Sequence, residues 1–249
     1  MKMSDERNVV LENKFLVQLD LLGIKLNEIQ IKQFHQYYEL LIEWNKVMNL
    51  TGITDYDEVN EKHFVDSLSI TNVADLSKIH TVIDIGTGAG FPGLPLKIVF
   101  PHLKIVLLDS LQKRIGFLNK VIEELGFQDV ISLHGRAEDY ARDIKYREKF
   151  DLCVSRAVAN LSVLSEYCVP YVKIGGSFIS YKSGNMEEEL EQSKSSVNIL
   201  GGKIEVVKKF NLPESNIERS LIVIRKRKST GKKYPRKAGI PTRSPLGGK

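Results

Sequence analysis

The chain has 249 residues, and 36 Lys and Arg against 31 Asp and Glu give it a formal net charge of +5 at pH 7. Hydrophobic residues make up 42% and charged residues 27%, which is ordinary for a globular protein and excludes collagen-like, wholly disordered and coiled-coil classes. No apolar run approaches the roughly 18 residues of a membrane helix, and the first residues lack the apolar core of a signal peptide. We therefore expect a cytoplasmic protein with no membrane contact.

The first third of the sequence predicts helices. Apolar side chains recur at helical spacing over residues 9–22 and again over residues 29–48. Thr54 and Asp55 then provide a cap for a further helix. We expect residues 1–75 to form an N-terminal helical cap on the main domain.

From Thr81 onward, short apolar strands alternate with amphipathic helices. This alternation predicts an α/β fold with a mostly parallel, Rossmann-like sheet of seven strands, covered by helices on both faces. We assign this core to residues 76–227. The strands are expected at residues 81–85, 104–108, 130–133, 150–155, 176–181, 202–208 and 217–225.

A glycine-rich loop, Gly86-Thr87-Gly88-Ala89-Gly90-Phe91-Pro92, joins the first of these strands to the helix that follows it. Glycines let a backbone turn sharply and approach a ligand closely, and the new helix directs its free N–H groups at the same place. The strand, loop and helix together predict a cofactor site.

The spacing of this loop discriminates among the ligands that such loops bind. A dinucleotide fingerprint needs a third glycine where this chain has Phe91, and a P-loop needs a Gly-Lys-Ser/Thr step that is absent. Asp109 ends the second strand, where it could accept hydrogen bonds from ribose hydroxyls or, alternatively, cap the next helix. Asp84 would repel a pyrophosphate and suit a sulfonium or an amino group. The pattern favours S-adenosylmethionine, bound through Gly86, Gly88 and Asp109, over a dinucleotide.

Two further candidates follow the third and fourth strands. Glu138 could accept a hydrogen bond from an adenine amino group, and the alternative is a carboxylate that only favours a helix start. Arg156 lies outside the carboxyl ends of the strands, where α/β ligands bind, and the alternative is an ordinary surface arginine.

Neither the two cysteines nor the five histidines have the spacing of metal ligands, so no metal site is predicted. Cys153 lies in an apolar strand and Cys168 in a helix, which indicates buried structural thiols. We interpret His63 and the other histidines as structural or surface groups.

The positive charge is concentrated at the C-terminus. Residues 225–249 contain ten Lys and Arg and no acid, which leaves a net charge of −5 for residues 1–224. With its prolines and glycines this end cannot form a core of its own, so we expect residues 228–249 to be a basic flexible tail. The charge of this tail has two interpretations: it contacts nucleic-acid phosphates, or it only aids solubility. Under the first, truncation near residue 228 should weaken RNA binding and spare cofactor binding.

Taken together, these residues resemble the bacterial RsmG (GidB) class of methyltransferases, over nearly the whole chain. The glycine loop alone would indicate only a class I methyltransferase. The helical lead-in, the Gly-Phe-Pro extension of the loop and the basic tail make the resemblance specific. It rests on residues 44–51, 63–68, 84–93, 109–114, 135–138, 155–157 and 234–241.

The resemblance implies a class I S-adenosylmethionine-dependent fold with one catalytic domain. It also implies methyl transfer to N7 of a guanine in small-subunit (16S) ribosomal RNA, so that the small ribosomal subunit or its RNA is the partner. The cofactor site it implies is lined by Gly86, Phe91, Ala137, Glu138 and Arg156.

Guanine N7 carries a free lone pair, so its methylation needs no prior deprotonation and we predict no catalytic base. Arg156 is expected to position guanine O6 or the cofactor carboxylate. A small-molecule methyltransferase and a non-catalytic RNA-binding assembly factor on the same fold stay open as alternatives, with an NAD-dependent oxidoreductase as a distant one. We expect a monomer, because no long apolar stripe is left over.

Overall fold

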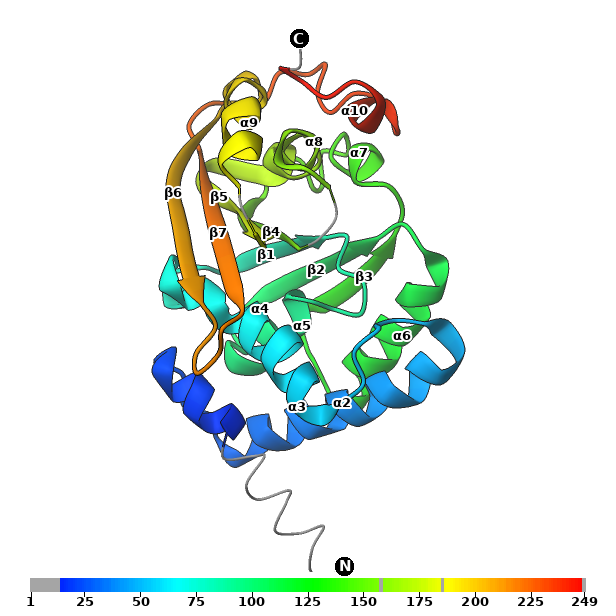
Figure 1. The fold of residues 1–249 in the computed structure, drawn as a ribbon. Helices are drawn as coiled ribbons and strands as arrows, with labels where there is room; N and C mark the ends of the chain where they lie inside the picture. Colours follow the sequence, from blue (N-terminus) through cyan, green and yellow to red (C-terminus); the bar gives the residue numbers. More distant parts are fainter. Residues whose placement is uncertain (1–13, 157–158, 185, 248–249) are drawn as a thin grey trace, which may run out of the picture.

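The structure is a computed structural model that describes residues 14–156, 159–184 and 186–247. The beginning of the helix expected over residues 9–22, Ala157 in one of the segments that carry the resemblance, and the last two residues of the expected tail lie outside these ranges. One seven-stranded sheet in the order β3-β2-β1-β4-β5-β7-β6 crosses the middle of the molecule (Figure 1). Strands β1 to β5 are parallel, and β7 is antiparallel to both β5 and β6. The predicted α/β sheet is confirmed.

The strands are β1 Thr81–Ile85, β2 Lys104–Asp109, β3 Val130–His134, β4 Phe150–Arg156, β5 Val172–Lys182, β6 Gly202–Asn211 and β7 Glu218–Lys226. Residues 14–21 are helical. The α-helices that follow are α2 Glu28–Met48, α3 Tyr56–Val59, α4 Asp66–Leu68, α5 Gly93–Val99, α6 Gln112–Glu124, α7 Ala137–Tyr140, α8 Leu161–Cys168, α9 Glu187–Ile199 and α10 Ile240–Arg243. A π-helix covers Asn60–Val65, and short 3-10 helices cover Ser69–Asn72, Leu76–Lys78 and Val169–Tyr171. No helix of the described ranges is long and apolar enough to span a membrane.

Strand β5 begins earlier than the sequence predicts. Phe150 pairs with Val172, but Leu152 pairs with Ser177, so β5 bulges between these two pairs. A bulge breaks the alternation of inward and outward side chains on which strand prediction depends. The expected strand therefore starts only at residue 176, just before regular pairing resumes at Ser177.

Each face of the sheet has its own hydrophobic core. Successive side chains of a strand point to opposite faces, so Val82 and Leu107 join one cluster of buried residues while Ile83 and Leu108 join the other. Helices α2, α4, α5 and α6 cover the first face, and α8 and α9 cover the second (Figure 1). Both cysteines are buried in the described structure, as expected.

The helical N-terminal part shares the first core instead of forming one of its own. Phe34, Tyr37 and Leu41 of α2 lie in the same buried cluster as Val82 of β1. The start of α2 is fixed by a capping box, in which Asn27 accepts from the Gln30 backbone N–H and the Gln30 side chain accepts from the Asn27 N–H. The expected helical cap is thus packed as one layer of the α/β core.

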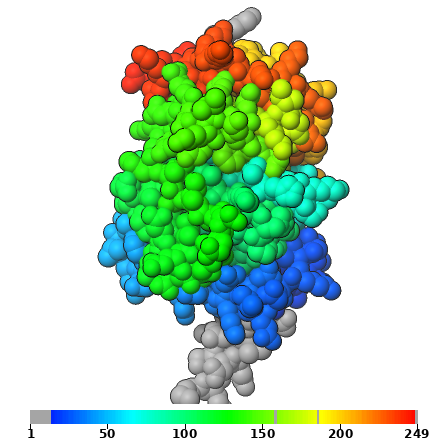
Figure 2. Space-filling model, turned by 180° about the vertical axis from the view of Figure 1, so that it is seen from behind, coloured from blue at the N-terminus to red at the C-terminus, as the bar shows by residue number. Residues whose placement is uncertain are grey.

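The C-terminal residues are packed where the sequence analysis expects a flexible tail. Residues 228–247, which we name the C-terminal strap, run across α7 and α8 and end beside α9 (Figures 1 and 2). Arg147 donates hydrogen bonds to the carbonyls of Thr230 and Tyr234 at 2.7 and 2.8 Å, and Arg142 donates to the carbonyl of Pro235 at 2.8 Å. The body of the protein therefore supplies the backbone partners that the strap cannot supply itself.

An ion pair completes this attachment. The Glu166 carboxylate in α8 is fully buried, and it accepts hydrogen bonds from Nη2 and Nε of Arg236 at 2.7 and 3.0 Å and from the Arg236 backbone N–H at 2.7 Å. Arg236 and Glu166 are 70 residues apart in sequence. Composition alone cannot show such a pairing, which is why a basic segment that reads as a free tail is docked.

We predict that Arg236→Met destabilises the protein by about 3 kcal/mol, because it leaves the buried Glu166 carboxylate without its cation. The matched control is Lys237→Met, since Lys237 is exposed and has no ion pair with a carboxylate of the described residues. The control should change the free energy of unfolding by less than about 0.5 kcal/mol. Urea unfolding of both variants is the measurement, and equal effects would show that the Glu166 contact does not hold the strap.

Candidate active site

The glycine loop is held at the carboxyl ends of β1 and β2. The backbone N–H groups of Gly86 and Thr87 donate to the carbonyl of Leu108 at 2.8 and 3.2 Å, which continues the parallel pairing beyond the strands. Gly88 adopts φ +62°, and no described atom lies within 4 Å of the place that a Cβ would take there. The loop thus faces open space at Gly88, as a ligand-binding loop must.

Asp84 shapes the loop from below. Its Oδ2 accepts from the Thr87 hydroxyl at 2.7 Å and from the Gly93 N–H at 2.9 Å. A Cβ on Gly93 would lie 2.4 Å from Leu107 and 3.0 Å from this carboxylate, so the close approach requires glycine. The other oxygen, Oδ1, is buried with no hydrogen-bond partner in the described structure. Burial raises the pKa of Asp84 to about 7, against the lowering by its two donors.

Asp109 is occupied by groups of the chain itself. Its Oδ2 accepts from the Gly88 N–H at 2.9 Å and from Arg114 at 3.0 Å, and its Oδ1 accepts from the Leu111 N–H at 2.9 Å. The side chain is only 2% exposed. The structure therefore shows a buried carboxylate that fixes the glycine loop and the turn before α6. It does not show a helix cap, because the N-cap of α6 is Leu111 and no described side chain caps that helix. Contact of Asp109 with a ribose stays a prediction.

Ala137 and Glu138 begin α7 at the neighbouring strand end. The Gly135 N–H donates to the Asp109 carbonyl at 3.0 Å, which ties this turn to the end of β2. The Ala137 carbonyl accepts from the Tyr171 hydroxyl at 2.6 Å. Glu138 is buried, and its Oε1 accepts from the N–H of Gly239 in the C-terminal strap at 3.0 Å. The candidate adenine-binding carboxylate is thus covered by the strap.

Phe91 and Arg156 are brought together from two different loops. The Arg156 guanidinium lies over the Phe91 ring, 5.0 Å from its centroid, and the His63 ring stacks on Phe91 at 4.6 Å. Phe91 also stacks on Tyr37 at 5.5 Å and is 6% exposed. The ring faces the helical layer, so Phe91 anchors the end of the glycine loop against α2 and the π-helix.

His63 belongs to this cluster as a neutral group. Burial, followed by the charge of Arg156, lowers the pKa of His63 to about 4. Its Nδ1 lies 3.2 Å from the carbonyl of Lys62 and its Nε2 lies 2.8 Å from the Thr51 hydroxyl. A neutral ring with the proton on Nδ1 satisfies both contacts, because a carbonyl can only accept. The structural role expected for His63 is compatible with this arrangement.

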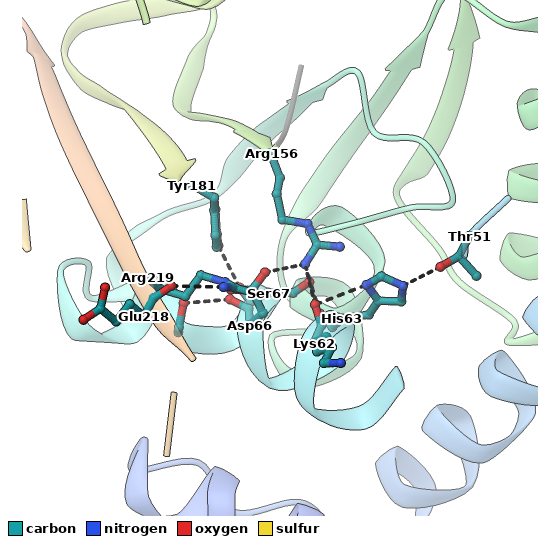
Figure 3. Close-up of polar contacts among 10 residues, drawn as sticks. Thr51, Lys62, His63, Asp66, Ser67, Arg156, Tyr181, Glu218 and Arg219 are labelled. Atoms are coloured by element: carbon teal, nitrogen blue, oxygen red, sulfur yellow. Dashed lines mark hydrogen bonds and ion pairs between the residues drawn. The ribbon is translucent and has the colours of Figure 1, made fainter. Parts of the chain in front are cut away.

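Asp66 joins two arginines at the same place (Figure 3). Arg156 at the end of β4 donates to Oδ2 at 2.7 Å, and Arg219 at the start of β7 donates to Oδ1 at 2.8 Å. The Asp66 side chain is only 4% exposed, whereas the arginines are 15% and 20% exposed. The Asp66 carboxylate thus fixes the position of both guanidinium groups, and each guanidinium stays partly exposed to solvent.

These side chains line a cavity of about 570 Å³. Its lining is mostly polar and charged and includes Lys62, His63, Asp66, Arg156, Tyr181 and Arg219. The π-helix Asn60–Val65 forms its floor, and π-helical turns are frequent at functional sites. The size suits one planar heterocycle with its sugar and phosphate.

The predicted site residues therefore form a row along four neighbouring strand ends. Ala137 and Glu138 follow β3, Asp109 ends β2, the glycine loop follows β1 and Arg156 ends β4. The sequence analysis missed Asp66 and Arg219, and it gave His63 no part in the site. The signal available for Asp66 and His63 was their place in a segment that carries the family resemblance, whereas Arg219 had none.

The described residues do not form a metal site. Among the residues described, no group of three or more His, Cys, Asp or Glu side chains could hold a metal ion. The ion pairs at the site are those of Asp109 with Arg114 and of Asp66 with Arg156 and Arg219.

Comparisons with known proteins show the family of this chain. The family described as rRNA small subunit methyltransferase G matches residues 30–221. A ribosomal RNA small subunit methyltransferase G of Lachnoclostridium phytofermentans is 53% identical, with 93% of this chain and 96% of the relative covered. One of Acetivibrio thermocellus is 52% identical, with 97% and 99% covered.

Among solved structures, a SAM-dependent methyltransferase of Aquifex aeolicus shares the fold with a TM-score of 0.52 at 16% identity. The likeness covers 71% of this chain and 96% of that one. The sheet thus has the same fold as that methyltransferase. At about half identity over nearly its full length, the chain belongs to the rRNA small subunit methyltransferase G family.

Proposed function

We propose that this protein transfers a methyl group from S-adenosylmethionine to N7 of a guanine in small-subunit (16S) ribosomal RNA. The observation that carries the proposal is the placement of two sites on one strip of strand ends. The glycine loop opens toward a cofactor, and the cavity at Arg156 begins where the loop ends at Phe91. A methyl donor and a planar acceptor can therefore meet between them.

The residues present fit the cofactor. Gly88 offers a backbone that faces open space, and Gly86 begins the loop at the end of β1. Asp84 offers a buried carboxylate with an unpartnered oxygen close beneath the loop. Ala137 and Glu138 would border the adenine, while Asp109 would act through the loop that it holds. When bound, S-adenosylmethionine supplies a methyl group on a positively charged sulfur. The negative charge near the loop suits such a cation.

Methylation of the proposed acceptor needs no proton-transferring group of the protein. Guanine N7 presents a lone pair on its Hoogsteen edge, so no base has to remove a proton before transfer. His63 is neutral at pH 7 and both of its nitrogens are engaged, which agrees with a role in shape. What remains for the protein is to align N7 with the methyl group, and alignment alone can lower a barrier by several kcal/mol.

Arg156 is suited to that alignment. Asp66 fixes one nitrogen of its guanidinium, the Phe91 ring fixes its plane, and the cavity lies on its open side. Guanine O6 neighbours N7 on the same edge of the base and accepts hydrogen bonds from arginine. A donor to O6 that leaves N7 free would orient the base for methylation.

A stacked duplex does not present N7 squarely to a recessed methyl group, so the target guanine should be looped or flipped. The substrate class places the reaction where ribosomes are assembled, so the proposal includes a cytoplasmic enzyme. We further propose that it acts as a monomer, because its exposed large hydrophobic side chains are scattered over separate elements.

The proposal predicts that the protein forms 7-methylguanosine on small ribosomal subunits that lack the modification. S-adenosylmethionine and subunits are incubated with the protein, and the digested RNA is analysed by mass spectrometry. Free nucleosides and short metabolites serve as competing substrates. Methylation of those alone would support the small-molecule alternative, and cofactor binding without any methylation of RNA would contradict the proposed acceptor.

Arg156→Gln should lower kcat/KM by about 100-fold, because a misplaced acceptor loses most of the benefit of alignment. Arg219→Gln is the matched comparison, since it removes the other arginine from the same Asp66 carboxylate and the same cavity. Unlike Arg156, Arg219 has no ring contact with Phe91. We expect similar losses of stability, about 1–3 kcal/mol for each variant, and a much smaller loss of turnover for Arg219→Gln. Equal losses of turnover would mean that Arg156 acts only by pairing with Asp66.

Cofactor affinity should depend on pH through Asp84. With a pKa of about 7, Asp84 is protonated below that pH, and binding of a sulfonium must then release the proton. Affinity for S-adenosylmethionine should therefore fall by up to about tenfold as the pH drops from 8 to 6. Calorimetry with S-adenosylhomocysteine, which has no sulfonium charge, is the control. The same pH dependence for both ligands would show that Asp84 does not act on the sulfonium and would assign it to the amino group that both ligands carry. No pH dependence for either ligand would show that Asp84 plays no part in binding.

A further inference from the structure

We propose that the exposed face of the C-terminal strap is a preformed binding surface for RNA phosphates, fixed at the edge of the cofactor site. This inference rests on the proposed function and names the surface by which that function would hold its RNA. It differs from the tail expected from sequence, because the cations sit on a docked segment instead of a free one.

The strap offers cations that no acid of the described structure neutralises. Residues 225–249 contain no Asp or Glu. Of the cations from residue 227 onward, Arg227 pairs with Glu205 and Arg236 pairs with Glu166. The other cations of the described strap are exposed, and none of them forms an ion pair with a carboxylate of the described residues. They are Lys228, Lys232, Lys233, Lys237 and Arg243. Five unpaired cations within sixteen residues are suited to a polyanion.

The attachment of the strap uses none of these cations, although Lys233 lies over the Tyr234 ring at 5.1 Å from its centroid. Arg142 and Arg147 hold it by its backbone carbonyls, and buried Glu166 engages only Arg236. At its beginning, Lys226 is buried, and it donates to the Val169 carbonyl at 2.8 Å and to the Thr230 hydroxyl. A segment fixed in this way does not lose conformational freedom when it binds, so more of each phosphate contact appears as affinity.

The strap also lies next to the candidate cofactor site. The Gly239 N–H donates to Glu138, and Thr242 and Tyr167 share a hydrogen bond of 2.8 Å between their hydroxyls. Lys237 is two residues from the first contact and Arg243 is next to the second. Figure 2 shows the strap, in orange and red, lying along one end of the molecule above the residues coloured green. RNA bound there would lie beside the row of strand ends.

This arrangement changes what a truncation can show. Removal of the strap would leave Glu166 without Arg236 and would uncover Glu138, so it would disturb the cofactor site as well as the surface. The expectation that truncation near residue 228 spares cofactor binding is therefore incompatible with these contacts. Substitution of exposed lysines alone isolates the surface.

The test is the triple variant Lys232→Ala, Lys233→Ala and Lys237→Ala. Its control carries Lys25→Ala, Lys32→Ala and Lys46→Ala, three exposed lysines in or beside α2, at the opposite end of the molecule (Figure 1). Binding to unmodified small ribosomal subunits is measured by co-sedimentation between 50 and 200 mM KCl, and S-adenosylmethionine affinity by calorimetry. Both variants change the net charge equally.

For the strap variant we expect weaker binding to the subunits, with the slope of log K against log salt reduced in magnitude by about 2 for three lost phosphate contacts. The control should keep the wild-type slope, and both should keep the wild-type affinity for S-adenosylmethionine. An unchanged slope in the strap variant, equal losses in both variants, or no salt-dependent binding by the wild type would each overturn the inference. Binding is read without methyl transfer, so a failure of the proposed reaction is seen separately, as intact binding without 7-methylguanosine.

Discussion

The site depends on one buried carboxylate, that of Asp66. It joins α4 to the end of β4 through Arg156 and to the start of β7 through Arg219, so three parts of the chain meet at a single side chain. Breaking a buried pair leaves an uncompensated charge, which makes this junction costly to open. The cavity beside it exists because the helical N-terminal layer is locked onto the sheet at this point. The N-terminal helices are thus a wall of the site as well as a cover of the core.

The two carboxylates beside the glycine loop, Asp84 and Asp109, fix the conformation of the loop. Both oxygens of Asp109 accept hydrogen bonds, from Gly88, Leu111 and Arg114. Asp84 accepts from Thr87 and Gly93 through one oxygen only. The ligand-facing part of the loop is then backbone, whose position these side chains determine. The raised pKa of Asp84 follows from the same burial that places it there.

The sequence predicted what short-range patterns determine. Strand β1 matches its expected bounds, and the loop after it lies where the glycines placed it, because strand alternation and glycine spacing are local properties. The contacts between Arg219 and Asp66 and between Arg236 and Glu166 join residues that are 153 and 70 positions apart. No periodicity encodes such pairs, so Arg219 was missed and the strap was expected to be free.

The two glutamates that dock the strap lie on the elements that follow β3 and β4. Glu138 lies in the first turn of α7 at the candidate adenine end, and Glu166 is buried in α8. An enzyme that works by alignment reacts faster when the contacts that hold a large substrate are rigid with respect to the reacting atoms. Motion between those contacts and the reacting atoms would widen the distribution of acceptor positions. A free tail would supply charge without that rigidity. Under the proposed function, docking the basic segment through Glu138 and Glu166 would fix the distance between the proposed phosphate contacts and the site of methyl transfer.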